Sequence, residues 1–349
     1  MNFNRYKKQF KETAKINGFS DDHIEKCLSY AALLHAKNLP IIFNAYHLAR
    51  LVGYSEAYLK KAIVHTDGFY RTFYIKKING KKRRISEPLP NLKDIQSWIL
   101  QNVLYARKTS PFAKAYIPGS GLKNNVKFHV NRSLVMTVDI KDFFPSLKLS
   151  AVENTFLSMG YSPKVSNLLA KLCCKNGSLP QGAPTSPYLS NLLFLPIDQS
   201  IANYCKKNKI YYTRYADDLT FSGDFSSSEL LNFIQIELKS MNLLVNDEKN
   251  KVMLPHMQQI VTGITVNKVP QVAHKIRNDL RKEIYYIQKF GIESHQLKAG
   301  IRDHNYIKQL WGKVSFVLHI NPLDKEFSSY KLFLKGCYGE LIGDSSVVE

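Results

Sequence analysis

A stretch near the middle of the chain, residues 210–223, reads IYYTRYADDLTFSG. It holds two adjacent carboxylates, Asp217 and Asp218, between flanks rich in β-branched and aromatic residues, which predicts a β-hairpin with the acids at its tip. Adjacent acids repel each other unless a cation lies against them, and Mg²⁺ prefers carboxylate and phosphate oxygens. An ordinary aspartate-containing turn would explain the same residues, so the rest of the chain has to decide between these interpretations.

The composition indicates a globular protein with a polyanionic partner. The chain has 349 residues, 44% of them hydrophobic, and a formal net charge of +21. Such an excess repels itself in the folded state unless a polyanion offsets it, so nucleic acid is the first partner to expect. A membrane surface is the competing polyanion. However, the sequence has no run of 18 apolar residues and no signal-peptide core, so we expect no membrane partner.

The cysteines argue for a reducing compartment. There are 5 of them, an odd number, and none has CxxC spacing. The sequence therefore predicts neither a disulfide framework nor a zinc site, and it fits the cytoplasm.

Periodicity divides the chain into three expected domains within an α+β fold. Residues 1–65 read as a helical N-terminal extension. Residues 66–268 mix strands and helices, and the Asn79-Gly80 pair between alternating strands predicts a hairpin turn. Residues 269–349 are mostly helical and basic.

Asp139 is the natural third acid for the hairpin. It closes an apolar strand, and two-metal phosphoryl transfer needs a carboxylate from a neighbouring strand. We therefore expect Asp139, Asp217 and Asp218 to come together. Of the two aromatic residues that follow, Phe143 and Phe144, one is expected in the core and the other could wall a sugar pocket.

Two further segments have an ordinary and a functional interpretation. Residues 179–187, LPQGAPTSP, are either a common Pro-rich loop or a helix start at which Gln181 and Gly182 meet a nucleotide. The KKRR run of residues 81–84 is either a solvated face or a finger that clamps triphosphate through arginine.

Four motifs occur together in a distinctive order, and they resemble those of bacterial reverse transcriptases. They are DIKDFF, LPQGAPTSP, YADD and LLVNDEK, which start at residues 139, 179, 215 and 243. Such a set is hard to produce by chance, unlike any one motif alone. The resemblance covers about residues 66–335 and implies a right-hand polymerase with fingers, palm and thumb.

Two more elements resemble retron reverse transcriptases in particular. NVKFH, starting at Asn125, looks like their NAxxH element, although Val126 stands where the family has Ala. Residues 261–263 match their VTG element, and WGKVSFVLHINP, starting at Trp311, looks like their thumb. Asn250 departs from the family, which more usually has Thr after the lysine of LLVNDEK.

The resemblance implies roles for individual residues. Asp139, Asp217 and Asp218 would hold two catalytic Mg²⁺ ions together with the backbone carbonyl of Ile140, and Lys249 would protonate the leaving pyrophosphate. The nucleotide-binding residues would be Arg83, Arg84, Phe144, Gln181 and Gly182, with Phe144 as the sugar-selecting aromatic and the better-aligned arginine left open. The RNA-binding residues would be Asn125, His129, Val261, Thr262, Gly263 and, along a basic thumb helix, Lys275, Arg277 and Arg281. For some of those helix side chains, a solvated face is the alternative.

At the level of function, the resemblance implies an RNA-directed DNA polymerase of the bacterial cytoplasm. It would use dNTPs to copy a cognate structured noncoding RNA, priming from an internal guanosine 2′-OH, into a branched RNA–DNA hybrid called msDNA. Host RNase H would remove the template, and an effector protein, a toxin, would be held in check for anti-phage defence. The alternatives are a group II intron or diversity-generating reverse transcriptase, and an RNA-binding scaffold with a vestigial polymerase.

Overall fold

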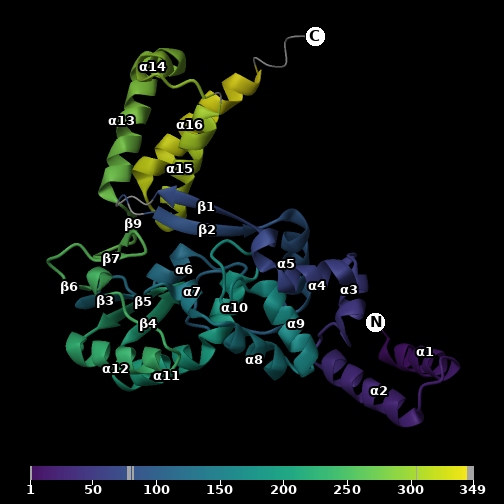
Figure 1. Cartoon of the computed structure of the whole chain (residues 1–349). Coiled ribbons are helices and arrows are strands. Elements are labelled where there is room, and N and C mark those ends of the chain that lie inside the picture. Colours follow the sequence, from purple (N-terminus) through teal and green to yellow (C-terminus); the bar gives the residue numbers. More distant parts are fainter. Residues whose placement is uncertain (1, 77–79, 81, 304, 344–349) are drawn as a thin grey trace. The chain divides into compact units, whose positions relative to one another are not determined.

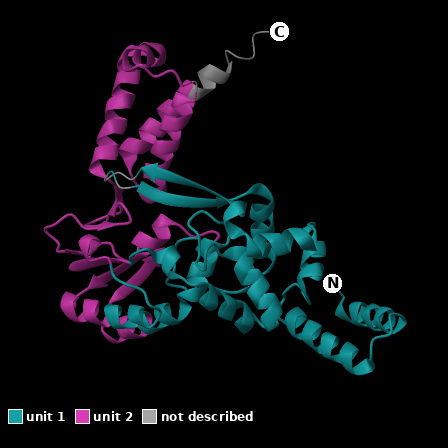
Figure 2. Ribbon diagram, in the orientation of Figure 1, with its two compact units in different colours: residues 1–117, 140–201, 234–245 teal, residues 118–139, 202–233, 246–349 magenta. Residues whose placement is uncertain are grey.

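The computed structural model describes residues 2–76, 80, 82–303 and 305–343 (Figure 1). Contacts divide the chain into two compact units that do not follow chain order (Figure 2). The first unit comprises residues 1–117, 140–201 and 234–245, and the second comprises residues 118–139, 202–233 and 246–349.

The first unit begins with helices that have well-defined N-caps. They are α1 (Phe3–Ile16), α2 (Asp21–Ala36), α3 (Ala45–Val52) and α4 (Glu56–Val64). The short 3₁₀ helix η1 (Thr66–Phe69) follows them and has no side-chain cap. The Ser20 side chain accepts from the backbone N–H of His23, and Ser55 accepts from that of Tyr58. Each bond satisfies one donor that a helix start leaves without a partner. The helical character expected for residues 1–65 is therefore observed in the described residues.

A two-stranded hairpin follows in the first unit. β1 (Tyr70–Lys76) pairs antiparallel with β2 (Lys82–Pro88), from Tyr70 opposite Pro88 to Lys76 opposite Lys82. These strands are the two that the sequence predicts on either side of the Asn79-Gly80 turn. Asn79 itself lies outside the described residues.

The rest of the first unit is helical. Its elements are α5 (Pro90–Asn102), η2 (Leu104–Ala106), α7 (Phe143–Ser146), α8 (Leu149–Met159), α9 (Pro163–Cys173) and α10 (Ser186–Leu193). Two longer helices, α11 (Leu195–Lys207) and α12 (Ser227–Lys239), each have one end in this unit and the other end in the second. Apolar side chains such as Phe156 and Phe194 are fully buried here.

An antiparallel sheet organises the second unit. In the described residues its strand order is β4-β5-β3-β6, with β3 (Leu134–Asp139), β4 (Tyr211–Tyr215), β5 (Asp218–Gly223) and β6 (Lys251–Met253). The register pairs Asp139 with Asp218 and Thr137 with Thr220. Because side chains alternate between the faces of a sheet, these residues share one face, while Val138 and Leu219 point to the other. α6 (Leu122–Val126) precedes β3, and η3 (Asp247–Lys249) precedes β6.

The C-terminal part of the second unit combines short strands with long helices. β7 (Ile260–Val261), β8 (Ile264–Thr265) and β9 (Gln271–Val272) form a small antiparallel sheet. They are followed by α13 (His274–Phe290), α14 (Ile292–Ala299), α15 (Tyr306–Ile320) and α16 (Lys325–Gly343). Residues from both groups, including Val261, Ile284 and Val314, belong to one apolar core.

Mixed helices and antiparallel sheets confirm the α+β class that the sequence predicts. The expected domain boundaries after residues 65 and 268 fall in connecting segments, and the division into functional domains stays a prediction. Among the described helices, none is long and apolar enough to span a membrane.

Candidate active site

The turn between β4 and β5 presents the two adjacent acids. Tyr215 pairs with Asp218, so Ala216 and Asp217 form a two-residue turn. Ala216 has a φ of +60°, which residues other than glycine rarely adopt. The fully buried Arg214 donates from Nη1 to the Ala216 carbonyl oxygen at 3.1 Å. The strand pairing of Tyr215 with Asp218 and the hydrogen bond from Arg214 to Ala216 therefore hold the tip of the hairpin in place.

Asp139 and Asp218 face each other across β3 and β5, as the sequence predicts for the third acid. Asp139 is only 6% exposed. Burial, with the negative charges of Asp217 and Asp139 next in size, raises the pKa of Asp218 to about 7. Asp217 and Asp139 thus lie close enough to Asp218 to oppose its ionisation, and a cation against the acids would offset this repulsion.

Lys249 and Asn246 bind the carboxylate of Asp139. The Lys249 ammonium lies 2.7 Å from Oδ1 and 2.9 Å from Oδ2, and Asn246 Nδ2 donates to Oδ2 at 2.9 Å. The Asn246 backbone N–H also donates to the Asp139 carbonyl at 2.8 Å. Burial opposes the charged form of Lys249, but the hydrogen bond and charge of Asp139 outweigh it, so its pKa is raised.

The contact made by Asn246 was missed in the sequence. Its signal was present in the LLVNDEK motif, three residues before the lysine that we singled out. Because Asn246 bonds to Asp139 through both backbone and side chain, it fixes the carbonyl of this residue as well as its carboxylate.

The acids have the ligand chemistry that Mg²⁺ prefers, but their side chains are not already arranged around one ion position. Within the described ranges, no three Asp, Glu, His or Cys side chains already surround a point where an ion could bind. Asp139 and Asp218 supply the hard oxygen ligands that Mg²⁺ prefers. The ammonium of Lys249 forms an ion pair with the carboxylate of Asp139. Ile140 belongs to the first unit, where it bridges to Val245, and its carbonyl stays a predicted ligand.

A separate cavity of the first unit brings together much of the predicted nucleotide-binding set. It has a volume of about 360 Å³, and Arg83, Arg84 and Gln181 line it. Lys82 and Lys175 add positive charge to its wall. Such a basic lining suits a polyphosphate, because arginine and lysine both bind phosphate oxygens.

Gly182 has a local reason to be glycine. Its φ is +126°, and a Cβ there would come within 2.9 Å of Ile85 Cγ2 and of the Ser86 carbonyl oxygen. The backbone of Ser86 donates to the Gln181 carbonyl at 2.8 Å. The loop before α10 therefore lies directly against β2, and this contact is what holds Gln181 beside the arginines.

Lys175 is a cationic residue of this basic cavity to which no sequence motif points. Its side chain is 8% exposed, and its ammonium lies 3.1 Å from Thr72 Oγ1 and 3.4 Å from Asp67 Oδ1. These partners come from sequence-distant segments, so no local motif pointed to it.

The two phenylalanines after Asp139 are both buried. Phe143 is 3% exposed and packs against Phe194, as expected for a core residue. Phe144 is 9% exposed and contacts Phe143 and Tyr116, with ring centroids 5.6 and 6.2 Å apart. Phe144 does not line the basic cavity described above, and its role at the sugar stays a prediction.

The predicted RNA-binding residues are unequally exposed. Asn125, His129 and Val261 have no exposed surface. Thr262 is partly buried and Gly263 is exposed at the turn between β7 and β8. Of these five residues, Thr262 and Gly263 alone have surface that a ligand can reach, whereas Asn125, His129 and Val261 contact only other parts of the protein.

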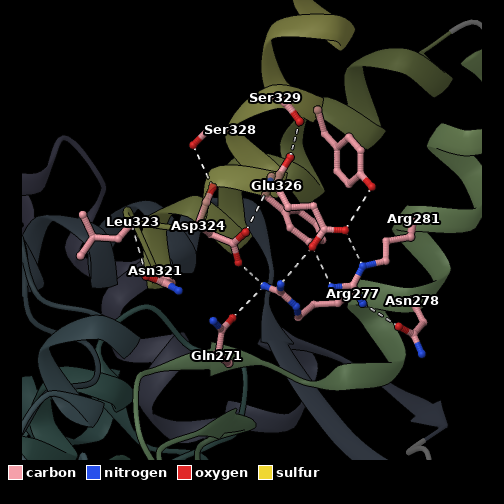
Figure 3. Close-up of polar contacts among 12 residues, drawn as sticks. Gln271, Arg277, Asn278, Arg281, Asn321, Leu323, Asp324, Glu326, Ser328 and Ser329 are labelled. Carbon is pink, nitrogen blue, oxygen red and sulfur yellow. Dashed lines mark hydrogen bonds and ion pairs between the residues drawn. The ribbon is translucent and has the colours of Figure 1, made fainter.

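Two of the predicted thumb arginines have partners within the protein (Figure 3). Arg277 Nη1 lies 2.5 Å from Asp324 Oδ2 and 2.7 Å from Gln271 Oε1. Arg281 binds both carboxylate oxygens of Glu326, at 2.6 and 2.7 Å. The Arg277 side chain is only 12% exposed. These arginines therefore connect α13 to the start of α16, whereas Lys275, on the same helix, is exposed.

Comparisons with known proteins agree with the motifs. The family profile described as "Reverse transcriptase (RNA-dependent DNA polymerase)" matches residues 75–298. The chain is 31% identical to the Retron Ec86 reverse transcriptase of Escherichia coli, over 75% of this chain and 84% of that protein. It is 30% identical to the Retron Mx65 reverse transcriptase of Myxococcus xanthus, over 84% and 72%. A solved telomerase from Candida albicans is 11% identical with a TM-score of 0.45, over 76% of this chain and 60% of that one.

The family match covers more than half of the chain, and the first relative is similar over most of its own length. The right-hand polymerase fold expected from the resemblance is thereby confirmed. The helices before residue 75 lie outside the family match. This chain belongs to the reverse transcriptase family, on its bacterial retron branch, and is an RNA-directed DNA polymerase.

Proposed function

We propose that this polymerase extends DNA by two-metal nucleotidyl transfer at Asp139, Asp217 and Asp218. The observation that carries the proposal is the pairing of Asp139 with Asp218 across adjacent strands, with Lys249 neutralising part of their charge. Two bound Mg²⁺ ions would supply stabilisation of the attacking and leaving oxygens. Asn246 and the turn at Ala216 would keep the acids in place, so that little rearrangement is needed during the reaction.

The chain's own cations complete the proposed chemistry. The Lys249 ammonium carries a proton at neutral pH, as lysine side chains ordinarily do, and a general acid for the departing pyrophosphate must supply such a proton. Arg83 and Arg84 would hold the triphosphate of the dNTP in the basic cavity, where Gln181 and Gly182 present backbone to the nucleotide. Phe144 would select the sugar, since a ring at that position leaves no room for a 2′-hydroxyl.

The proposed template is a cognate structured noncoding RNA. We propose that synthesis starts from an internal guanosine 2′-OH and yields a branched RNA–DNA product, msDNA, which the protein keeps bound. Similarity to retron reverse transcriptases supports this proposal, as does the net charge of +21, which favours a polyanionic partner. The proposed direct RNA contacts are the turn residues Thr262 and Gly263, together with Lys275 on α13.

The proposed cellular setting follows from the same similarity. The enzyme would act in the bacterial cytoplasm, host RNase H would remove the template, and a toxic effector protein would be restrained by the complex in anti-phage defence. This part rests on the retron relatives alone.

The proposal is tested by DNA synthesis on the cognate RNA with dNTPs and Mg²⁺. Wild-type protein should make DNA covalently linked to RNA. The double variant Asp217→Asn/Asp218→Asn should make none while its RNA affinity stays within twofold of wild type. Asp224→Asn, an exposed acid just after β5, is the matched control and should be fully active. Full-length synthesis by the double variant would refute the metal site, and DNA without a linked RNA would refute 2′-OH priming.

A further inference from the structure

Four fully buried polar side chains form a continuous hydrogen-bonded chain in the second unit. Ser222 Oγ lies 2.7 Å from His129 Nδ1, and His129 Nε2 lies 2.8 Å from Thr213 Oγ1. The Thr213 hydroxyl donates to Asn125 Oδ1 at 2.7 Å. Each of these residues is at most 1% exposed. Buried polar groups on this scale are costly unless every one is satisfied, so the chain is a demanding arrangement for the fold.

The protons along this chain have a single consistent direction. Asn125 Oδ1 can only accept, so the one hydroxyl proton of Thr213 is committed to it. Thr213 Oγ1 must then accept from His129 Nε2–H, which leaves Nδ1 to accept from Ser222. Histidine is therefore neutral here. Its pKa agrees, because burial, and secondarily the charge of Arg132, lower it to about 3.

This hydrogen-bonded series of side chains is attached to both strands of the hairpin that carries the acids. Thr213 belongs to β4 and Ser222 to β5, while Asn125 and His129 come from the segment around α6. Ser222, Thr220 and Asp218 alternate along β5, so all three project from the same face of the sheet. His129 therefore bridges the two strands on the face from which Asp218 projects.

The same chain continues to the exposed turn. Asn125 Nδ2 donates to Thr262 Oγ1 at 3.4 Å, a long hydrogen bond. Thr262 has a φ of +47° and Gly263 one of +83°, so both central residues of this turn are left-handed. A β-branched residue is a poor choice for that conformation, which costs roughly 1–3 kcal/mol. Strain of this kind is kept where the side chain is needed, and here the hydroxyl of Thr262 is what Asn125 binds.

We infer that Asn125 and His129 are positioning residues of the polymerase. They hold the hairpin that carries Asp217 and Asp218 in a fixed position relative to the turn at Thr262. They do not read RNA directly. Instead, they join the turn that we propose to contact RNA to the strands that present the acids. This inference rests on the proposed function, because it assigns the hairpin its catalytic role.

Thr220 offers a matched control for this inference. It lies on the same face of the same hairpin, directly opposite Thr213, and is 1% exposed, as Thr213 is. Unlike Thr213, its Oγ1 has no hydrogen-bond partner within the described structure. Threonine-to-valine substitutions at the two positions remove the same hydroxyl from equally buried sites, but only one of them breaks the chain.

The test compares Thr213→Val and Thr220→Val in steady-state DNA synthesis on poly(rA)/oligo(dT) and on the cognate RNA. A misplaced reacting group can cost roughly 10- to 100-fold in rate. We expect Thr213→Val to lower kcat by that factor on both substrates, with the KM for dNTP and the Kd for RNA within twofold of wild type. Thr220→Val should match wild type, and Thr213→Ser, which retains the hydroxyl, should restore kcat.

A second arm tests the connection to the turn. Thr262→Val keeps the shape of the side chain and removes the hydroxyl that Asn125 binds, so it should lower kcat on poly(rA)/oligo(dT) as well. The double variant Thr213→Val/Thr262→Val should lose less than the product of the two single losses, because both break one chain. If Thr213→Val does not fold, as judged by thermal unfolding, Ser222→Ala serves in its place.

Several results would overturn the inference. Equal kcat for Thr213→Val and Thr220→Val would show that the chain does not position the hairpin. Weaker RNA binding by Asn125→Ala at unchanged kcat would show instead that this element acts on RNA. Failure of the proposed function is recognised separately, since wild-type protein would then make no DNA or Asp217→Asn/Asp218→Asn would still make it.

Discussion

The ammonium of Lys249 lies between both carboxylate oxygens of Asp139, 2.7 Å from one and 2.9 Å from the other. Asp139 is almost fully buried, whereas the Lys249 side chain is 53% exposed and can move away. The lysine therefore supplies the positive charge that the buried acid requires, and it is the partner that can leave when another cation binds to Asp139.

Replacing Lys249 by glutamine removes the proposed general acid. General acid–base groups contribute typically about 10²- to 10⁴-fold to rate, so kcat for nucleotide addition should fall into that range while RNA affinity changes little. Single-turnover incorporation on poly(rA)/oligo(dT) measures the step directly. Lys251→Gln, an exposed lysine of the adjacent β6, is the control and should keep wild-type kcat. A Lys249→Gln enzyme with unchanged kcat would remove Lys249 from the chemistry.

Replacing Asp218 by asparagine should stabilise the metal-free protein. The substitution removes a charge that burial and the repulsion from Asp217 and Asp139 disfavour, and single stabilising substitutions commonly add about 0.5–2 kcal/mol to the unfolding free energy. Added MgCl₂ should raise the thermal midpoint of wild type by mass action and that of Asp218→Asn much less. Choline chloride at equal ionic strength controls for salt. A variant less stable than wild type without metal would contradict this account.

Acid should destabilise the protein partly through His129. Burial lowers the pKa of His129 to about 3 in the folded state, against about 6.5 for an ordinary histidine. Between these values the unfolded chain binds the proton and the folded protein does not. The stabilisation is therefore fully present above about pH 6.5 and is lost as the pH falls, by at most about 1.4 kcal/mol per pH unit. Urea unfolding of wild type and His129→Gln at pH 5, 6 and 7 should give the shallower dependence for the variant. Equal slopes would mean that His129 is accessible to protons.

Two residues of α13 should affect different properties: Arg277 the stability of the protein, and Lys275 its affinity for RNA. The Asp324 side chain, 6% exposed, pairs with Arg277, and breaking a buried pair costs roughly 3–5 kcal/mol. Asp324→Asn should therefore lower the unfolding free energy by about that amount. Lys275→Ala should leave stability unchanged and weaken RNA binding, with the slope of log Kd against log salt smaller by about 0.7–0.9. Equal effects of Lys275→Ala and Arg277→Ala on RNA affinity would contradict the division.

The family of this protein is readable in the sequence because short motifs carry its signature. Asp139 ends one strand and Asp218 begins another, with Asp217 in the turn just before it, and local residue preference already indicates these strands. Motif order identified the family, and the comparisons confirmed it together with the α+β fold. Each motif, and each helix or strand, depends on residues close together in the chain, so a local sequence pattern is sufficient to predict it.

Only the tertiary structure decided which polar residues face inward. Asn125 and His129 stand in a recognisable element, yet their partners Thr213 and Ser222 are more than 80 residues away along the chain. Arg277 lies on a basic helix and pairs with an acid 47 residues further on. A sequence shows that a side chain can donate a hydrogen bond or carry charge. Whether RNA, water or the protein itself receives it depends on long-range packing, which no local pattern contains.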